Sequence, residues 1–308
     1  METIFDCLKA GLGADSANRF ESRRLFHGRG QCYPGLGFVS VDWFEPVLSV
    51  TLFEEPPSGW ESDFRMGLDS LLENSPVECV LMQRRYLPQA PTVAIHGSMP
   101  EEAFARRGPL RFRLAFGQRQ NCGYFLDMEP GRKWLAERCR GKRVLNLFAY
   151  TCAFSVVAIE AGAERVVNVD MSSGALNEGR ENHRSNGLPV ERSSYLAGNV
   201  LKSWGRIRRQ GPYDLAIVDP PSFQRGSFEA GKDYRKVARR LPDLLVSGGE
   251  ALACLNAPEL GTDFLKNTFE TAAPDLVFDR RLVPDPDFPD RDPERQLKLL
   301  AFRKQPET

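Results

Sequence analysis

Short apolar strands alternate with helical segments along the second part of this 308-residue chain, and this alternation constrains the fold more than any other feature. The predicted strands lie at 144–148, 165–170, 193–197, 213–218, 250–255, 276–283 and 296–302. Segments with helical periodicity lie between them, at 155–161, 174–186, 233–246 and 262–273. Such alternation produces parallel βαβ units, in which helices cover both faces of one sheet. We therefore predict an α/β fold over residues 116–308.

The first part of the chain has a different pattern, with strands of period two and few helical segments. Its predicted elements are two strands within 35–54, a helix at 64–74 and strands at 77–82 and 111–116. A turn at Glu45-Pro46 separates the first two strands. These elements indicate a small α+β domain at 20–115, which follows an N-terminal extension at 1–19.

The charge balance restricts the kinds of partner that the chain can bind. Forty-one Lys and Arg residues oppose 41 Asp and Glu residues, so that the net charge is zero. A nucleic-acid-binding protein usually has a basic surplus, and contact with RNA would here depend on local basic runs. The candidates are 132–143, 206–209 and 232–240, although each also fits a solvated helix face. We expect such a surface to be salt-sensitive and confined to the catalytic edge of the sheet.

Cysteine and histidine usage gives no sign of a metal site. The seven cysteines include no C-x-x-C pair, and the three histidines are scattered. Reduced thiols in a cytoplasmic protein are expected. The first residues lack the apolar run of a secretory signal, and no stretch approaches the roughly 20 apolar residues that span a bilayer. The sequence leaves the oligomeric state open.

Ligands of parallel α/β sheets bind beyond the carboxyl ends of the strands, and the residues there indicate the chemistry. The loop at 146–152 contains neither G-x-G-x-x-G nor G-x-x-x-x-G-K-[ST], which argues against a dinucleotide fingerprint or a P-loop. Asp170 ends the second strand, where it could accept hydrogen bonds from ribose hydroxyls or cap a helix equally well. Asn199 follows the third strand, where a small polar side chain suits an adenine edge.

The fourth strand ends in the most informative motif, Asp219-Pro220-Pro221-Ser222-Phe223. Two prolines cannot continue the strand ladder and hold the backbone extended. A rigid carboxylate beside an aromatic ring suits a planar base that has left its stack. The alternative is a strand that simply ends in prolines and a capping acid.

Several motifs together resemble those of S-adenosylmethionine-dependent methyltransferases. They are NLFAYTCAF at 146–154, NVDMS at 168–172, IVDPPSF at 217–223 and QNCGYFLDMEPGR at 120–132. The chain most resembles the bacterial large-subunit ribosomal RNA base methyltransferases of the RlmI and RlmK type, over residues of about 20–305. The resemblance implies a Rossmann-like class I sheet of seven strands, the last antiparallel, after the small α+β domain. A PUA domain, present in RlmI relatives, is not expected here.

The resemblance also implies S-adenosylmethionine as cofactor, RNA as partner and roles for particular residues. The residues implied to contact the cofactor are Phe125, Asp127, Asn146, Phe148, Tyr150, Asp170, Met171, Asn199 and Asp219. Of these, Asn146, Phe148 and Tyr150 would contact its methionine end. Asp219, Pro220 and Phe223 would face the target base.

Three departures from the family pattern affect these expectations. Cys152 stands where the family has glycine, and its side chain is expected to narrow the turn. Glu129 reverses a charge in the family's Leu-Asp-x-Arg segment, although Arg132 is retained. Asn256 occupies the place of the nucleophilic cysteine in members that methylate cytosine C5, as it does in the RlmK type.

The last departure bears on the reaction. Methylation of cytosine C5 needs a thiolate that adds to the ring, and Cys254 is the alternative candidate close by. We predict that a ring or exocyclic nitrogen is methylated and that Cys254 is a buried core thiol. Two other functions are considered: methylation of a small molecule or protein, and RNA binding by a non-catalytic relative. An oxidoreductase shares the sheet but not its glycine fingerprint.

Overall fold

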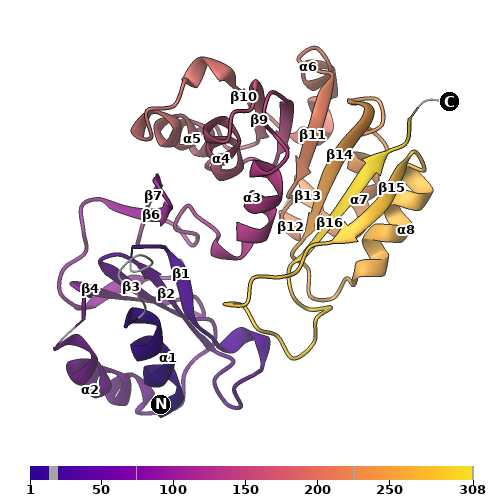
Figure 1. Cartoon of the computed structure of the whole chain (residues 1–308). Coiled ribbons are helices and arrows are strands. Elements are labelled where there is room, and N and C mark those ends of the chain that lie inside the picture. Colours follow the sequence, from indigo (N-terminus) through magenta and orange to yellow (C-terminus); the bar gives the residue numbers. More distant parts are fainter. Residues whose placement is uncertain (14–19, 74, 225, 307–308) are drawn as a thin grey trace. The chain divides into compact units, whose positions relative to one another are not determined.

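The computed structural model describes residues 1–13, 20–73, 75–224 and 226–306, and the chain divides into two compact units (Figure 1). The first unit comprises Met1–Leu126 and Pro286–Arg291, and the second comprises Asp127–Asp285 and Asp292–Thr308. The domain boundaries expected from the sequence stay a prediction. In the described part of the chain, no helix has the length and apolar character needed to cross a bilayer.

The second unit contains a seven-stranded sheet with the order β10-β9-β8-β11-β14-β16-β15. Its strands are β8 (Arg143–Leu147), β9 (Arg165–Asp170), β10 (Ser193–Ala197), β11 (Tyr213–Val218), β14 (Leu245–Leu255), β15 (Leu276–Arg281) and β16 (Lys298–Lys304). The pairs β10–β9, β9–β8, β8–β11 and β11–β14 are parallel, whereas β16 is antiparallel to both β14 and β15. The predicted sheet, with an antiparallel last strand, is confirmed.

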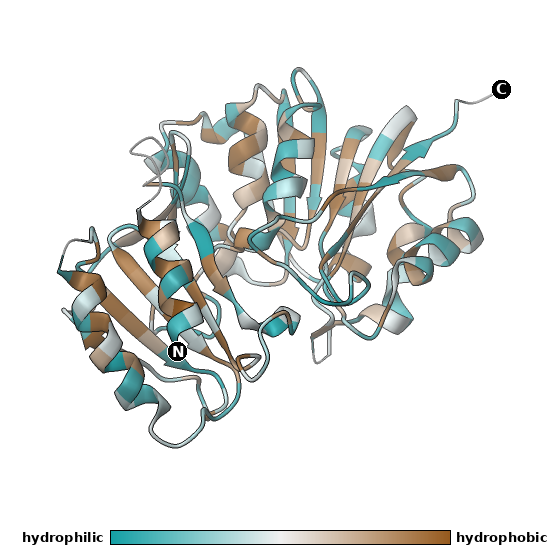
Figure 2. Cartoon of the chain, turned by 60° about the horizontal axis from the view of Figure 1, so that its bottom comes forward, coloured by the Kyte–Doolittle hydropathy of each residue, from teal (hydrophilic) through white to brown (hydrophobic). Residues whose placement is uncertain are grey.

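Helices cover both faces of this sheet because alternate strand residues point to opposite sides. The helices are α3 (Glu129–Ala136), α4 (Ala153–Glu160), α5 (Ser173–Ser185), α6 (Trp204–Arg208), α7 (Ala230–Ala238) and α8 (Thr262–Ala272). In β11, Ile217 belongs to an apolar cluster with residues of α3 and α4, and Val218 to a cluster with residues of α6, α7 and α8. Figure 2 shows the apolar residues along the strands. Both faces of the sheet are therefore buried.

One predicted helix is too long. A helix was expected over 233–246, but α7 ends at Ala238 and β14 begins at Leu245. Pro242 explains the difference, because proline lacks an amide donor and disfavours helical geometry in the residue before it. Leu241 and Leu244, which carry the helical periodicity, are instead buried in the apolar cluster beside α7 as part of the turn.

The first unit has its own five-stranded sheet, of order β1-β2-β3-β4-β5. Its elements are α1 (Glu2–Leu12), β1 (Arg23–His27), β2 (Val39–Phe44), β3 (Val47–Leu52), α2 (Trp60–Leu72), β4 (Cys79–Arg84), β5 (Thr92–His96), β6 (Ala103–Arg107) and β7 (Leu110–Leu114). Both helices contribute to one core, in which Leu8 and Phe64 are buried. Within the part of the chain that the structure describes, β6 and β7 pair only with each other. The sequence predicts α2, β2, β3, β4 and β7 but misses α1, β1, β5 and β6.

Candidate functional site

The loop after β8 takes an unusual backbone conformation. Phe148, Tyr150 and Cys152 have φ values of 60°, 46° and 61°, which lie in the left-handed region that favours glycine. Such conformations persist where surrounding contacts enforce them, and they concentrate at functional sites. Here the backbone amide of Tyr150 donates to Asp170 Oδ2 at 2.9 Å, and that of Ala149 donates to the Val169 carbonyl at 3.0 Å. The loop is therefore held against the carboxyl end of β9.

Asp170 is the residue that organises this end of the sheet. Besides the Tyr150 amide, its carboxylate accepts the backbone amide of Ser172 on Oδ1 at 2.8 Å. Ser172, and not Asp170, is the N-cap of α5, because its Oγ accepts the Ala175 amide at 3.1 Å. Each carboxylate oxygen has a second lone pair, which can accept a hydrogen bond from a hydroxyl group. Next to it, the side chain of Met171 is 45% exposed.

Asn199 lies beyond β10 as the N-cap of a short 3-10 helix at Val200–Lys202. Its side-chain Oδ1 accepts the backbone amide of Leu201 at 2.8 Å, and its carbonyl accepts the Ser203 hydroxyl at 2.8 Å. The side-chain oxygen is thus already engaged by the backbone. The Nδ2 group is the part of Asn199 that is suited to donate to a ring nitrogen.

Asn146, whose contact with the cofactor stays a prediction, lies in a buried polar network. Its side chain is 1% exposed, and its Nδ2 donates to Asn168 Oδ1 at 2.9 Å. Asn168 Nδ2 donates in turn to Ser155 Oγ at 3.0 Å, and this hydroxyl lies 3.0 Å from His183 Nε2. Burial lowers the pKa of His183, which favours its neutral form. Asn146 therefore ties β8 to β9, α4 and α5 within the core and presents almost no surface to a ligand.

Hydrogen bonds hold the Asp219-to-Phe223 segment near both of its ends. The Asp219 amide contacts the Leu147 carbonyl at 3.4 Å, and the Ser222 hydroxyl donates to the Asn256 carbonyl. Phe223 begins the two-stranded ribbon formed by β12 (Phe223–Gln224) and β13 (Phe228–Glu229). The side chain of Phe223 is 68% exposed, whereas that of Pro220 is buried. The loop therefore presents one aromatic side chain to solvent beside the end of β11.

The carboxyl group of Asp219 is strongly perturbed. Burial, together with the negative charge of Asp127, raises its pKa from 3.8 to about 8, although the positive charge of Arg132 acts in the opposite direction. Arg132 is 2% exposed and forms an ion pair with Glu129 at 3.0 Å. Glu129, the residue that departs from the family pattern, thus forms an ion pair with the arginine that partly stabilises the Asp219 carboxylate. Near neutral pH a large fraction of Asp219 is protonated and can donate a hydrogen bond.

The two candidate positions for a cysteine nucleophile differ in exposure. Cys254 is 0% exposed in the apolar cluster with residues of α3 and α4. Burial, Asp219 and Asp127 all raise its pKa well above the ordinary value, so that the thiol stays protonated. Asn256 is exposed at the end of β14 and carries no nucleophile.

The side chain of Cys152 is buried between the loop and α5 and does not line an open turn. It occupies the space above Gly179, where an added Cβ would lie 2.4 Å from Cys152 Sγ. The side chain of Cys152, which was expected to narrow the turn, therefore points into the core. Sequence reasoning missed Gly179, whose only signal is a glycine in mid-helix.

Phe125 and Asp127 fall on different sides of the division between the units. Phe125 belongs to the first unit and Asp127 begins the second. Asp127 acts electrostatically on Asp219 within the second unit. The predicted contact of Phe125 with a cofactor stays a prediction. Over residues 1–13, 20–73, 75–224 and 226–306, no group of three His, Cys, Asp or Glu side chains is placed to hold a metal ion.

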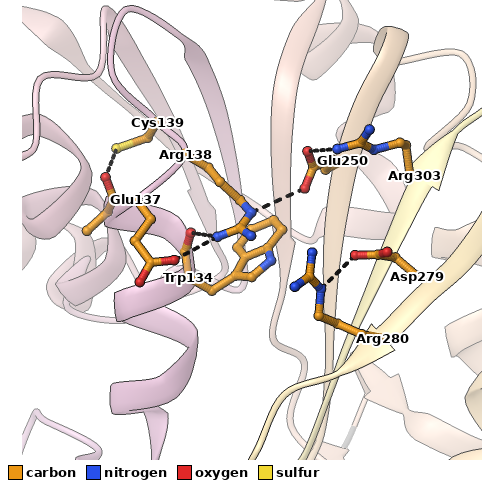
Figure 3. A network of polar contacts seen from close by, with 9 residues as sticks. Trp134, Glu137, Arg138, Cys139, Glu250, Asp279, Arg280 and Arg303 are labelled. Carbon is orange, nitrogen blue, oxygen red and sulfur yellow. Dashed lines mark hydrogen bonds and ion pairs between the residues drawn. The ribbon is translucent and has the colours of Figure 1, made fainter.

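The basic run at 132–143 does not form one surface. Arg132 is buried, and Arg138 forms ion pairs with Glu137 at 3.0 Å and Glu250 at 3.5 Å (Figure 3). Glu250 also binds Arg303 at 2.9 Å, so that these charges join the turn after α3 to β14 and β16. The charge of Arg138 is therefore balanced by acids.

The other two basic runs contact neighbouring groups. Arg206 donates to the carbonyl of Ala197, the last residue of β10, at 3.0 Å, whereas the Gln210 carbonyl after the run accepts from Arg143 at the start of β8. Within 232–240, Lys232 and Lys236 are ion-paired with Glu229 and Asp233. Contact of the three runs with RNA at the catalytic edge stays a prediction.

Comparison with known proteins identifies the family. A model of the S-adenosylmethionine-dependent methyltransferase family matches residues 23–303. The chain belongs to this family. The predictions of family, fold and cofactor are thereby confirmed.

Curated relatives and solved structures agree with this assignment. Ribosomal RNA large subunit methyltransferase I of Erwinia tasmaniensis is 32% identical over 270 residues, which cover 84% of this chain and 66% of the relative. The corresponding protein of Aeromonas hydrophila is 32% identical over 167 residues, and the match spans 52% of this chain but only 42% of the relative's length. The crystal structure of SMU.776, a proposed methyltransferase complexed with SAH, superimposes with a TM-score of 0.87 at 22% identity, covering 98% of this chain and 80% of the other.

The contact between Cys152 and Gly179 predicts a coupled pair of substitutions. We expect Gly179→Ala to lower the free energy of unfolding by about 1–3 kcal/mol and to weaken S-adenosylmethionine binding, because the new methyl group overlaps Cys152. Adding Cys152→Gly should restore much of both, since glycine tolerates the left-handed φ at that position. Gly231→Ala in α7 is the matched control, with open space around its Cβ. Denaturant unfolding and calorimetry measure the effects, and additive losses in the double variant would contradict the coupling.

The perturbed pKa of Asp219 predicts a pH-dependent stability difference. Since this pKa is about 8 in the folded chain and 3.8 ordinarily, folding favours the protonated form. The stability of the wild type relative to Asp219→Asn should therefore fall as pH rises from about 4 to about 8 and level off above. Urea unfolding of both proteins between about pH 5 and about pH 9 measures the difference. Parallel stability curves would show that Asp219 titrates normally.

Proposed function

We propose that this chain transfers a methyl group from S-adenosylmethionine to a nitrogen of a base in large-subunit ribosomal RNA. The observation that carries the proposal is the Asp219-to-Phe223 loop, which presents a perturbed carboxyl group and an exposed ring at the carboxyl edge of the sheet. Relatives named ribosomal RNA large subunit methyltransferase I and K/L support RNA as the substrate. This function corresponds to a cytoplasmic protein, as the sequence predicts.

The residues around β9 and β10 fit the cofactor. Asp170 is fixed by two backbone amides and keeps lone pairs for the ribose hydroxyls. Met171 is exposed enough to cover the adenine ring, and Asn199 has an amide donor for its edge. The left-handed backbone at Phe148 and Tyr150 shapes the loop proposed to receive the methionine end. When bound, the cofactor supplies an electrophilic methyl group on its sulfonium.

The proposed base site combines stacking with a hydrogen bond. The exposed ring of Phe223 offers a flat surface on which an extruded base stacks. Asp219, protonated, donates to a ring nitrogen or carbonyl of the base; ionised, it accepts from an exocyclic amine. Pro220, which is buried and lies between them in the sequence, restricts the backbone that connects the two groups. The contribution of these residues to the rate is chiefly the alignment of the base with the methyl group.

The residues at the end of β14 favour nitrogen over cytosine C5 as the methyl acceptor. Cytosine C5 becomes reactive only after a thiolate adds to the ring, and the exposed residue after β14 is Asn256, which has no thiol. Cys254 is buried and its thiol is held in the protonated form. A ring nitrogen such as guanine N7 already carries a lone pair and needs only correct placement.

Mass spectrometry of ribosomal RNA from cells with and without this gene tests the proposal. We expect one methylated nucleotide to disappear on deletion and to return with the wild type but not with Asp170→Ala or Phe223→Ala. Calorimetry should then show that Asp170→Ala loses cofactor affinity, whereas Phe223→Ala keeps it. Cofactor binding without any change in RNA would favour a small-molecule or protein substrate. Absence of cofactor binding in the wild type would favour a non-catalytic relative.

The buried position of Cys254 predicts that its thiol is dispensable. Cys254→Ser should retain methyl transfer within about twofold, with at most a modest loss of stability for a buried hydroxyl. Single-turnover assays with labelled cofactor measure the rate. Loss of activity in Cys254→Ser, with a covalent enzyme–RNA adduct in the wild type, would establish the cytosine C5 reaction instead.

A further inference from the structure

Residues 254–257 form the end of β14 and the two residues after it, beside β16 (Figure 1). Leu255 pairs with Lys298, the first residue of β16, and the ladder between the two strands ends there. Side chains of three other elements then bind the backbone carbonyls of the segment. They are Tyr234 of α7, Ser222 of the loop after β11 and Lys298. The backbone of 254–257 is therefore fixed by contacts outside its own strand.

Two of these contacts join the segment to the end of β11. The hydroxyl of Tyr234, a residue that is 0% exposed, lies 3.0 Å from the Cys254 carbonyl and 3.3 Å from the Val218 carbonyl. The Ser222 hydroxyl donates to the Asn256 carbonyl. Asn256 is thus attached directly to the Asp219-to-Phe223 loop, which forms the proposed base site.

The third contact places an ammonium group in the interior. Lys298 is 0% exposed, and its Nζ donates to the carbonyls of Ala257 at 3.1 Å and Glu294 at 2.7 Å. In the part of the chain that the structure describes, this Nζ forms no ion pair with a carboxylate. Burial lowers the pKa of Lys298, as expected for a charge removed from water. An apolar side chain would fill the same space without this cost, so the contribution of the lysine is to hold the backbone after β14.

The residue held in this way is Asn256, whose side chain is exposed. Among the described residues, its side-chain amide has no hydrogen-bond partner. A planar amide offers a donor and an acceptor side by side, which matches a base edge that carries an acceptor next to a donor. Because the backbone at this position is already ordered, binding through the amide costs little further conformational entropy.

We propose that Asn256 binds the hydrogen-bonding edge of the target base and that Lys298 is its positioning residue. The proposal rests on the proposed function, because it requires an RNA base at the Asp219-to-Phe223 loop. Stacking on Phe223 leaves the base able to rotate within its own plane. A donor–acceptor pair from the Asn256 amide removes this rotation and directs the reacting nitrogen toward the methyl group.

The variants Asn256→Asp and Asn256→Ala test the base contact in the full chain. Single-turnover methyl transfer to ribosomal RNA from cells that lack this gene is measured with labelled cofactor at saturating RNA. We expect both variants to be about 10- to 100-fold slower than the wild type at about pH 8, because each loses the donor–acceptor pair. Toward about pH 5, Asn256→Asp should regain rate relative to the wild type, since a protonated carboxyl group offers the same donor and acceptor as the amide. Asn256→Ala should regain none.

The matched control is Asn267→Asp in α8, which makes the same charge change at another exposed asparagine. It should match the wild type at every pH. Dividing each rate by that of the wild type at the same pH removes the titration of Asp219 from the comparison. The cofactor Kd and the melting temperature of both Asn256 variants should equal those of the wild type, because the side chain is exposed.

The positioning role of Lys298 is tested by combining substitutions. Lys298→Met should slow methyl transfer about fivefold in an otherwise wild-type chain and add little to Asn256→Ala, because a positioning residue acts through the residue that it holds. A purely structural role predicts instead that the two losses multiply, and that result would overturn the assignment of Lys298.

Two results for Asn256 would overturn the base contact. They are wild-type rates in both variants, and equal losses in both variants at every pH. Failure of the proposed function is a different result: the wild type transfers no methyl group to this RNA, and the inference then falls with it.

Discussion

Parallel pairing of β8 with β9 and β11 is the constraint on which the rest of the second unit depends. Because these strands run in one direction, the loop after Leu147, Asp170 and Asp219 all reach the same edge of the sheet. Burial of the sheet on both faces leaves the strand ends as the places where polar side chains meet solvent. The Asp170 carboxylate then fixes the first loop by accepting the Tyr150 amide.

The charged groups beside this edge of the sheet determine the protonation of Asp219. Asp219 follows a run of buried residues at 215–218, and Asp127 adds a second negative charge. Arg132 only partly offsets these effects, and Glu129 is its ion-pair partner. A carboxyl group of this kind exchanges its proton near neutral pH and can both donate and accept hydrogen bonds. The same surroundings keep the Cys254 thiol protonated, so one environment accounts for both observations.

Most of the sheet could be predicted from the sequence because its signal is local. Each buried strand is a short apolar run, and Pro220 and Pro221 end β11 as expected. The roles predicted for Asp170 and Asp219 were tied to these strand ends and remain compatible with their placement. The helix at 233–246 was overextended because periodicity continued past Pro242. The strand β5 was missed because its side chains are mostly exposed and show little apolar alternation.

By itself, the sequence determined the α/β class, the family and the residues that end each strand, since these depend on nearest neighbours along the chain. Only the tertiary structure decided what those residues contact. It placed Asn146 inside a polar network with Asn168, located the recess at Gly179 that receives Cys152, and paired Arg138 with Glu250 of a distant strand. These outcomes involve residues distant in sequence, and burial and charge act through space. No local pattern records such distances.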